Sequence, residues 1–312
     1  MKPSCKTLHI GIILLLACGS RVHADNVYVS NSGGGTIEEF NSMGNGSIFA
    51  SGLDDPTGLA FDSSGNLYVA NAGSGTIVKF DSSKNSSIFA LGLNNPAGLA
   101  FDSSGNLYVD CLGNFTVGSG TIEKFDPSGN GSIFASGLGF SGPSHLAFDS
   151  RGNLYASTTR TIEEFDSGGN ESTIYSAWGN FVYGLAFDYT GNLFVSLQNG
   201  GAVLGLNGGG ITFGNPFTAC PAGLAFDSDN NLYVTLDGAI EKFNSFGGTT
   251  QRVPEANSIV FASGLDGAEY IAIQAAPESP TWAMIAMSAV VWMASHHMRG
   301  RRYRMDVLHY GR

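Results

Sequence analysis

Short apolar runs alternate with small polar and glycine-rich segments along the central part of the chain. One stretch of twelve residues, Gly58-Leu-Ala-Phe-Asp-Ser-Ser-Gly-Asn-Leu-Tyr-Val69, returns as residues 98–109. Looser copies follow at residues 145–156, 184–195 and 223–234. The apolar positions show no helical periodicity, and their short runs between turn residues are typical of β-strands. Successive copies lie 39 to 47 residues apart, a period found in propellers and in helical arrays.

Each repeated unit predicts four short strands. In the second unit they are residues 98–101, 107–110, 121–125 and 132–135. The first two strands are joined by Asp-x-x-Gly-Asn, a tight turn in which the Asp accepts from a nearby backbone N–H and the Gly supplies a positive φ. Asn230 replaces that Gly in the fifth copy, and Asn is the next best residue for the left-handed region.

The sixth copy is split between the two ends of the repeat region. Residues 270–273 are a degraded Gly-Leu-Ala-Phe half, and residues 26–29 are an isolated Asn-Leu-Tyr-Val half. Each half completes the other, so the repeats form a ring in which every sheet covers its neighbours. The sequence therefore predicts an all-β protein, a six-bladed β-propeller of four-stranded blades over residues 25–276. Residues 270–273 pair with residues 26–30 to close it.

The repeat resembles the NHL family of propellers. The pattern Gly-Leu-Ala-Phe-Asp-x-x-Gly-Asn-Leu-Tyr-Val is carried by residues 58–69 and 98–109. The resemblance covers about four fifths of the chain by its repeats. It implies the propeller fold, and it leaves function open because this scaffold hosts both binders and enzymes.

Residues 1–24 are predicted to be an export signal that signal peptidase removes. Two lysines precede an apolar core at residues 8–17, and Val22-His-Ala24 offers a small-residue cleavage site. So short an apolar core cannot span a bilayer as a helix. The alternative is lipidation at Cys18, which follows Leu-Leu-Ala as in a bacterial lipobox.

Residues 277–312 resemble a PEP-CTERM sorting signal of envelope-bearing bacteria. Pro277-Glu-Ser-Pro280 precedes an uncharged segment that reaches Met298, and an arginine cluster follows at residues 299–304. The resemblance implies processing by a membrane enzyme, an exosortase. The alternative is a plain transmembrane tail anchor, because residues 279–298 would span about 30 Å as a helix. Both interpretations place the propeller outside the cytoplasm.

The predicted propeller is strongly acidic. Residues 25–276 contain 24 of the 26 acidic residues but only 7 of the 15 basic ones, a net charge of −17. Such a surface repels phosphate backbones and anionic membranes. Nucleic acid is therefore excluded as a partner, and low charge density with 44 glycines reflects tight turns rather than disorder.

Cysteine and metal chemistry have little support in the sequence. Cys111 and Cys220 fall on blades three positions apart, too distant for a disulfide, and both are expected to be small buried residues. His145 is the only histidine in residues 25–276, which excludes a His-rich zinc or iron site. We expect no cofactor. Calcium at residues 227–231 is an alternative to simple turn chemistry there.

Departures from the repeat are the best indicators of function, because an active or binding site is usually one unrepeated cluster. Many of them fall on the face where the first strand of each unit begins. The candidate ligand-binding residues are Asp110, Phe115, His145, Trp178, Phe181, Tyr183, Glu269 and Tyr270. Aromatic rings beside polar loops suit sugar or peptide contacts. The alternative is that these rings fill the central channel or a loop core.

Two functional hypotheses follow, and neither assigns a catalytic residue. The first is an exported, non-enzymatic propeller that binds an extracellular polysaccharide, peptide or protein through its loop face. The second is a lactonase-like or lyase-like hydrolase that uses a divalent cation in the channel, where Glu269 begins an innermost strand. A third option is that the repeats form only a stable spacer.

Overall fold

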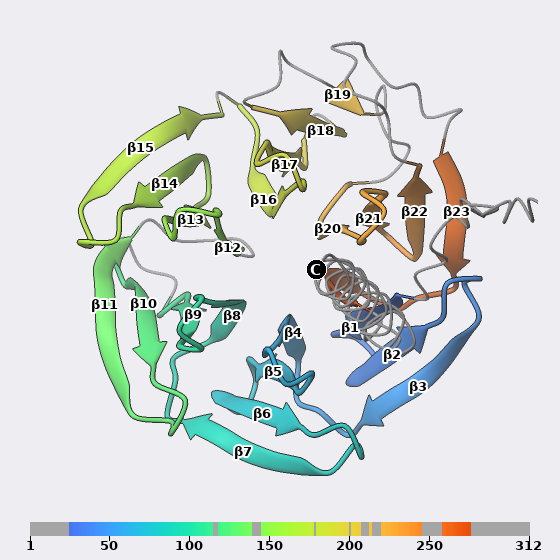
Figure 1. Cartoon of the computed structure of the whole chain (residues 1–312), viewed down its shortest axis with the longest axis horizontal. Helices are drawn as coiled ribbons and strands as arrows, with labels where there is room; N and C mark the ends of the chain where they lie inside the picture. Colours follow the sequence, from blue (N-terminus) through green and yellow to red (C-terminus); the bar gives the residue numbers. More distant parts are fainter. Residues whose placement is uncertain are drawn as a thin grey trace, which may run out of the picture.

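The computed structural model describes the propeller region with short gaps. The described residues are 25–114, 118–138, 145–177, 179–199, 201–206, 212–213, 220–244 and 258–275. Within them the strands form six four-stranded sheets arranged as blades around an axis (Figure 1). The predicted six-bladed β-propeller is thus confirmed. No helix in the described part of the chain is long and apolar enough to cross a membrane, and the predicted segments 1–24 and 277–312 lie outside that part.

From the axis outward, the strands of each blade are as follows. Blade 1 comprises β24 (Ala268–Gln274), β1 (Asn26–Asn31), β2 (Thr36–Phe40) and β3 (Gly46–Ser51). Blade 2 comprises β4 (Pro56–Phe61), β5 (Leu67–Asn71), β6 (Thr76–Phe80) and β7 (Ser86–Leu91). Blade 3 comprises β8 (Pro96–Phe101), β9 (Leu107–Cys111), β10 (Gly120–Phe125) and β11 (Gly131–Leu138).

The remaining three blades follow the same order. Blade 4 comprises β12 (Leu146–Phe148), β13 (Leu154–Ser157), β14 (Thr161–Phe165) and β15 (Glu171–Ser176). Blade 5 comprises β16 (Val182–Phe187), β17 (Leu193–Leu197), β18 (Ala202–Gly205) and β19 (Thr212–Phe213). Blade 6 comprises β20 (Leu224–Phe226), β21 (Leu232–Leu236), β22 (Ala239–Phe243) and β23 (Ser258–Ser263).

The ring is closed by the split copy of the repeat. β24 pairs antiparallel with β1, with Val27 opposite Ile273 and Val29 opposite Ile271. The pairing extends beyond the predicted residues because Asn26 also lies opposite Gln274. Blade 1 therefore takes its innermost strand from the end of the repeat region and its other strands from the beginning.

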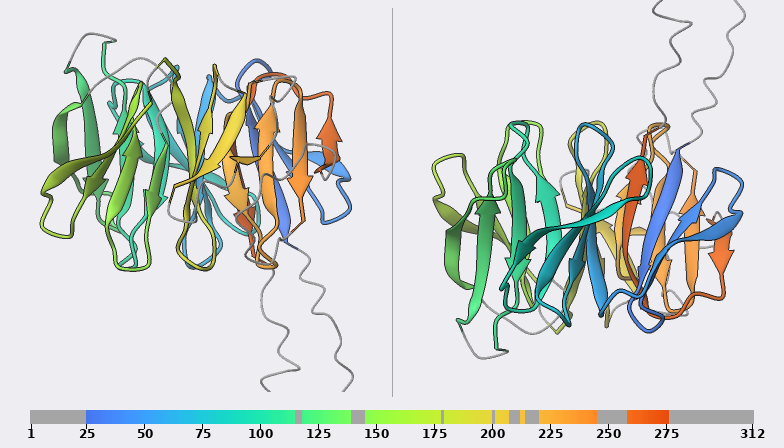
Figure 2. Two further views of the ribbon diagram at one scale, coloured as in Figure 1. Left: turned by 90° about the horizontal axis from the view of Figure 1, so that it is seen from above. Right: turned by 90° about the horizontal axis from the view of Figure 1, so that it is seen from below.

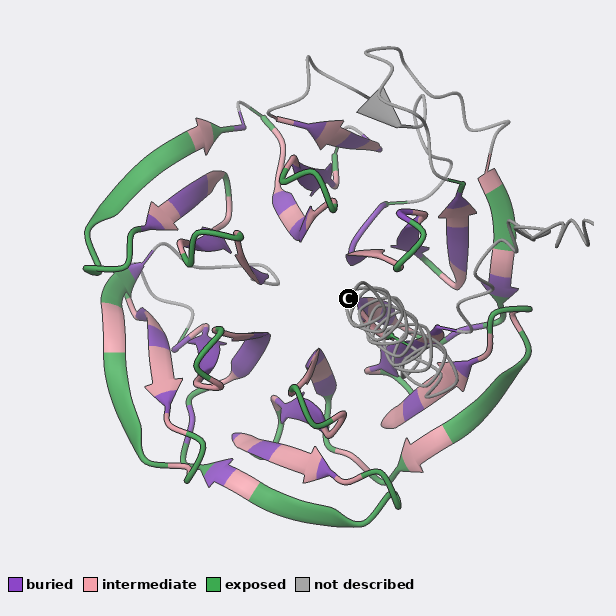
Figure 3. Ribbon diagram, in the orientation of Figure 1, coloured by how far each residue is buried: buried purple, intermediate pink, exposed green. Residues whose placement is uncertain are grey.

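The core consists of inter-blade layers of aromatic and aliphatic side chains. In blades 2 to 6, the Phe that ends the innermost strand meets an aromatic ring of the preceding blade, as in Tyr28 with Phe61, whose centroids are 4.9 Å apart. The same contact joins Tyr68 with Phe101, Tyr108 with Phe148, Tyr155 with Phe187, and Phe194 with Phe226. The repeated Phe of the sequence is thus the residue that packs sheet on sheet. Among the strands, the outermost ones are the most exposed (Figure 3).

The Asp-x-x-Gly-Asn turns are built as the sequence predicts. In blade 2, Asp62 Oδ1 accepts from the backbone N–H groups of Ser64 and Asn66, each at 2.9 Å. Its Oδ2 accepts from the Asn66 side chain at 2.7 Å. In blade 6 the Gly position is held by Asn230, with φ of 63°, so the expected left-handed Asn is confirmed.

The two faces of the propeller differ in what they carry. The turn face holds the Asp turns, and it is where β1 begins and β24 ends (Figure 2). The opposite face, which we call the mouth face, is where the innermost strands begin and the second strands end. Both ends of the described propeller therefore leave from the face opposite the candidate residues.

Candidate functional site at the channel mouth

Hydroxyl groups on the second strands fix the innermost strands around the axis. Ser157 of β13 accepts from the backbone N–H of His145 at 2.8 Å and donates to the carbonyl of Tyr183, in the next blade, at 2.8 Å. The same bridge recurs at Ser196, between Gly184 and Ala222, and at Thr235, between Gly223 and Glu269. Each hydroxyl thus joins the innermost strand of its own blade to that of its neighbour.

The first position of the Gly-Leu-Ala-Phe half controls how closely these strands approach. A Cβ at Gly58 would lie 2.0 Å from the carbonyl oxygen of Ala97, and one at Gly184 would lie 2.3 Å from that of Ala222. Glycine at these positions therefore permits tight contact between neighbouring blades. Two blades break the rule, because the equivalent residues are His145 in blade 4 and Tyr270 in blade 1.

His145 and Tyr270 meet across the axis. Blades 1 and 4 are opposite each other in the ring (Figure 1). The two rings are stacked, with centroids 4.3 Å apart and planes inclined by 13°. His145 is 9% exposed and Tyr270 is 3% exposed. The two buried rings therefore occupy the axis between blades 1 and 4.

The polar atoms of this stack have no hydrogen-bond partner among the described residues. The orphaned atoms are Nδ1 and Nε2 of His145 and the hydroxyl of Tyr270. Burying such a group without a partner costs about 1–3 kcal/mol. Burial lowers the pKa of His145 to about 3, so the imidazole is neutral at physiological pH.

Acidic groups from several blades act electrostatically on the Tyr270 hydroxyl. Burial raises its pKa well above the usual value, and the charges of Glu269, Asp110 and Asp55 add to that rise. Asp110 lies at the end of β9, and Asp55 directly precedes β4. Burial, followed by the charge of Asp55, also raises the pKa of Glu269. Carboxylates of blades 1 and 3, and that of Asp55 beside blade 2, thus share the mouth face and influence the stack electrostatically.

An open pocket of about 480 Å³ adjoins this acidic mouth. It lies between the inner strands of blades 5, 6 and 1, and its lining includes Tyr183, Gln198, Cys220, Asp237, Ala268 and Glu269. Burial raises the pKa of Tyr183, and the charge of Glu269 adds to the effect. We call this cavity the side pocket, and together with Asp55, Asp110 and Tyr270 it forms the candidate site.

The structure brings together five of the eight residues predicted from the sequence. They are Asp110, His145, Tyr183, Glu269 and Tyr270. Phe181 faces the Arg160 guanidinium, whose carbon is 5.8 Å from the ring centroid. Phe115 and Trp178 lie outside the described residues.

Sequence reasoning missed four members of the site that carry a polar or thiol side chain. They are Asp55, Gln198, Cys220 and Asp237. Their only common signal is position, because each lies next to the beginning of an innermost strand or the end of a second strand. The flanking sequence differs from blade to blade there, so no repeat marks it.

The two cysteines behave differently from each other. Both are free, as expected for residues on blades three positions apart. Cys111 is buried, and burial raises the pKa of its thiol. The expectation that Cys220 is also buried was wrong, because it is exposed in the side pocket. It directly precedes the innermost strand region of blade 6, where the chain enters from the mouth face.

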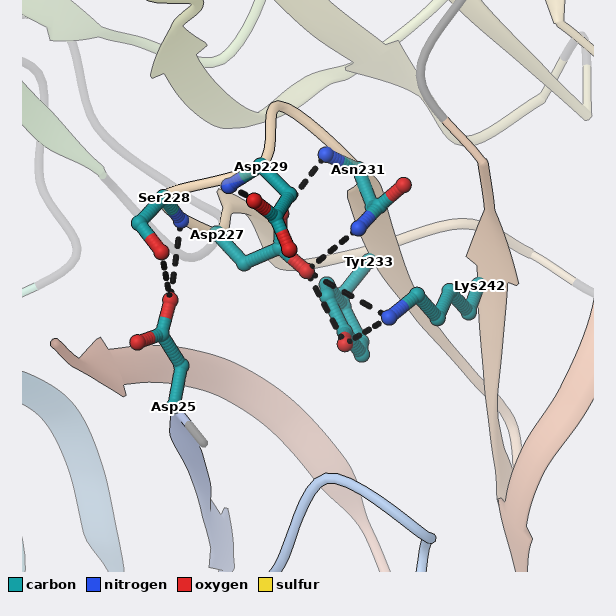
Figure 4. Close-up of polar contacts among 7 residues, drawn as sticks. All are labelled: Asp25, Asp227, Ser228, Asp229, Asn231, Tyr233 and Lys242. Atoms are coloured by element: carbon teal, nitrogen blue, oxygen red, sulfur yellow. Dashed lines mark hydrogen bonds and ion pairs between the residues drawn. The ribbon is translucent and has the colours of Figure 1, made fainter. Parts of the chain in front are cut away.

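Hydrogen-bond donors occupy the segment considered as a calcium loop (Figure 4). Asp227 Oδ1 accepts from the N–H groups of Asp229 and Asn231, and Oδ2 lies 3.3 Å from the Lys242 ammonium. An ammonium beside the carboxylate disfavours a second cation, so turn chemistry accounts for the segment. Asp25 also stabilises this turn, accepting from the backbone N–H of Ser228 at 2.8 Å. Across the described residues, no three His, Cys, Asp or Glu side chains are placed to hold a metal ion.

Comparison with known proteins supports the fold and one copy of the repeat. The NHL repeat family matches residues 53–80, a range that contains the first complete copy. No curated protein sequence matches the chain. Among solved structures, a chain of a nidogen/laminin complex has a TM-score of 0.64 at 16% identity, covering 80% of this chain and 98% of that one.

Two enzymes are also similar in structure. A gluconolactonase from Xanthomonas campestris has a TM-score of 0.59 at 12% identity, covering 82% of this chain and 94% of that one. Virginiamycin B lyase from Staphylococcus aureus has a TM-score of 0.56 at 14% identity, covering 70% of this chain and 78% of that one. At such identities the likeness concerns the fold alone, which these binding and catalytic proteins share.

Proposed function

We propose that the protein is an exported, non-enzymatic binding module that takes an extracellular polypeptide or polysaccharide on its mouth face. The observation that carries this proposal is an open pocket next to an axis that is occupied by two stacked rings. The His145–Tyr270 stack fills the channel, and the side pocket opens next to it. Concave sites with a few convergent polar groups are where proteins bind ligands.

The positions of the chain ends support the same assignment. β1 begins and β24 ends side by side on the turn face, with Asn26 opposite Gln274. A propeller held at the cell envelope through residues 277–312 would therefore direct its mouth face away from the anchor. The anchor and the export signal remain proposals based on the sequence.

The alternative is a cation-dependent lactonase-like or lyase-like enzyme. The carboxylates of Glu269, Asp110 and Asp55 favour it, because all three raise the pKa of Tyr270 from the same face. The described residues nevertheless offer no three-ligand metal group. The enzyme would need a stoichiometric divalent cation, whereas a binding module retains its partner in the presence of a chelator.

Binding of the mature protein to immobilised extracellular proteins and polysaccharides tests the proposal. Tyr183→Ala should weaken capture of a bound partner at least about tenfold, because the ring lines the pocket. The matched control is Tyr189→Ala, since Tyr189 is 82% exposed in a turn-face loop. Equal effects of both variants, or turnover of a lactone that requires bound cation, would contradict a binding role for the mouth.

A further inference from the structure

Aromatic rings fill the outer layer between neighbouring blades in a repeated arrangement. In blades 1, 2, 3 and 6, a Phe of the outermost strand packs against the Tyr of the second strand of its own blade. These pairs are Tyr28 with Phe49, Tyr68 with Phe89, Tyr108 with Phe134, and Tyr233 with Phe261, and their centroids lie 5.0 to 5.3 Å apart. The outer Phe also contacts the Phe that ends the third strand of the next blade, as Phe49 contacts Phe80. Each of these layers therefore holds a trio of rings.

The layer between blades 4 and 5 lacks two rings of this trio. Ile174 stands in β15 at the register shift where Phe49 stands in β3. Leu206 follows β18 and donates its backbone N–H to the carbonyl of Leu193, the first residue of β17, at 2.8 Å. Phe80 lies opposite the first residue of β5 in the same way. Two aliphatic side chains therefore stand where the other layers have rings.

A cavity of about 440 Å³ opens at this place, and we call it the flank pocket. It is lined by Tyr155, Ile174 and Leu206, which hold the positions of the trio, and by Arg151, Glu164 and Tyr175. Ile174 is 42% exposed. The groove between blades 6 and 1 differs, because it keeps Phe261 and Phe40 and its lining does not include Tyr233. Replacement of the two outer rings thus leaves open space beside Tyr155.

The charge in the flank pocket is incompletely paired. Glu164 of blade 4 and Glu39 of blade 1 are equivalent, because Oε1 of each accepts from a Tyr hydroxyl at 2.8 Å and from an Asn side chain at 2.9 Å. Oε2 of Glu39 lies 3.0 Å from the Lys84 ammonium of blade 2, which is also 4.6 Å from the centroid of the Phe49 ring. Oε2 of Glu164 has no partner among the described residues. The layer between blades 1 and 2 therefore contains a ring and a cation that the flank pocket lacks.

Arg151 does not supply this cation. Its Nε lies 3.1 Å from Asp149 Oδ2, and its side chain is 76% exposed. The ion pairs of the described residues do not join it to Glu164. The residue of blade 5 that is equivalent in sequence to Lys84 is Gly210. The guanidinium thus borders the opening of the flank pocket, where Asp149 balances its charge.

The flank pocket opens beside a free strand edge. Among the described strands, β15 is the outermost of its sheet and pairs on one side only, with β14. An extended polypeptide can add to such an edge, and side chains two positions apart along it then point to the same face of the sheet. A ring that enters the flank pocket and a side chain two residues away would therefore both face the lining.

We propose that the flank pocket binds a polypeptide partner through an aromatic side chain with a lysine or arginine two residues away. The ring would pack beside Tyr155, and the cation would meet Oε2 of Glu164, as Phe49 and Lys84 do between blades 1 and 2. Aromatic residues that fill a pocket are typical anchors of protein interfaces. The flank pocket lies away from the mouth face, so this site is independent of the binding function proposed above.

Calorimetric titration of the mature protein with three pentapeptides tests the proposal. The peptides are Thr-Phe-Thr-Lys-Thr, the same peptide with Leu for Phe, and the same peptide with Glu for Lys. The first should bind about threefold or more tightly than either of the others, because it alone offers both the aromatic contact and the ion pair. Equal affinities, or binding of the first peptide weaker than about 1 mM, would overturn the proposal. Tighter binding of the Glu peptide would assign the site to Arg151 and overturn the basic residue.

Ile174→Phe restores the ring that the other blades carry. The variant should bind the Phe-Lys peptide about tenfold or more weakly, because its own ring takes the place of the ligand. Its melting temperature should be unchanged or raised, since filling a cavity is stabilising. The matched control is Ile133→Phe, which adds the same ring at a 68% exposed position of an outermost strand beside a layer that already holds Phe134. Unchanged peptide binding by Ile174→Phe would refute the pocket, and a lowered melting temperature would contradict the open space beside Tyr155.

Glu164→Gln tests the cation separately. It should weaken binding of the Phe-Lys peptide about threefold or more, because a charge-assisted contact is lost, and it should not weaken binding of the Phe-Glu peptide. The matched control is Glu39→Gln, which removes the same charge from the equivalent position, where Lys84 is already bound. Equal losses in the two variants would show non-specific attraction and overturn the proposal. Capture of a partner that depends on Tyr183 reports on the mouth face alone, so either site can fail without the other.

Discussion

The first residue of the Gly-Leu-Ala-Phe half determines how the innermost strands pack. Glycine there lets neighbouring strands approach closely, whereas a larger residue places its ring on the propeller axis. Where the repeat has glycine, a side chain would collide with the neighbouring strand, as at Gly58 and Gly184. His145 and Tyr270 occupy this position on opposite blades, and their rings meet. The repeat and its exceptions are therefore parts of one packing arrangement around the channel.

Replacing His145 by Phe should change how stability depends on pH. The folded imidazole stays neutral down to about pH 3, whereas the unfolded one binds a proton below about 6.5. The unfolded state thus binds more protons in this window, and the wild-type protein loses stability as pH falls through it. His145→Phe keeps a ring in the stack and removes the titration.

Chemical denaturation at pH 7 and pH 5 provides the measurement. The variant should match or exceed the wild type at pH 7, and its relative advantage should grow by about 2 kcal/mol at pH 5. Glu269, whose pKa is raised in the folded state, has the opposite sign but contributes to both proteins equally. If the free energy of unfolding changed with pH equally in the wild type and in His145→Phe, the assignment of a buried neutral imidazole would be contradicted.

The individual strands show what the sequence can and cannot predict. The third and fourth strands of blade 3, expected at residues 121–125 and 132–135, occur as β10 (Gly120–Phe125) and β11 (Gly131–Leu138). The outer strand is longer because register shifts near Gly120 and Ile122 extend its pairing. Apolar patterning identifies buried strands well, but it says less about outermost strands, whose side chains are largely exposed.

Polar contacts made by the third strands also cannot be predicted from the repeated sequence. Lys79, Lys124 and Lys242 each lie over the Tyr ring of the second strand of their own blade. The equivalent residues of blades 1 and 4 are Glu39 and Glu164, which instead accept from the Tyr hydroxyl. The same position of the third strand is thus a lysine in some blades and a glutamate in others. Because the residue type is not shared, a consensus of the repeats does not reveal its contact with the tyrosine.

Lys242→Met should lower the free energy of unfolding by about 1–2 kcal/mol. Lys242 Nζ is 2.6 Å from the Tyr233 hydroxyl and 3.3 Å from Asp227 Oδ2, and its side chain is only 20% exposed. Lys84→Met is the comparison, because that side chain is 50% exposed and should cost less than about 1 kcal/mol. Urea denaturation measures both, and a larger loss at Lys84 would contradict this ordering.

For the whole molecule, the split repeat was sufficient to predict the ring and its closing strand. It also placed Cys111 and Cys220 apart, and the same relation between blades puts His145 opposite Tyr270. The side pocket was less predictable, because Asp55 lies in a variable connection and its role depends on three-dimensional convergence. Repeated residues reveal the scaffold, whereas the site is made of residues that share no pattern.

Truncation after Gly264 should abolish cooperative unfolding. The loss of β24 removes the innermost strand of blade 1, exposes Val27 and Val29 of β1, and deletes Tyr270 from the stack. Removing only residues 277–312 is the control and should leave the transition unchanged, since the closing strand remains. Calorimetry would contradict closure by β24 if the shorter protein melted like its parent.

The pairing of β24 with β1 has a mechanical consequence. Glu269 and Tyr270 lie near the beginning of β24, and the chain leaves this strand at the opposite face after Gln274. A partner held at the mouth and an anchor beyond residue 276 would therefore pull on the two ends of one strand. Tension would act in shear along the antiparallel ladder with β1, so its hydrogen bonds would resist together rather than break one by one. Blade 1 would carry this load, and the other five blades would not lie between the partner and the anchor.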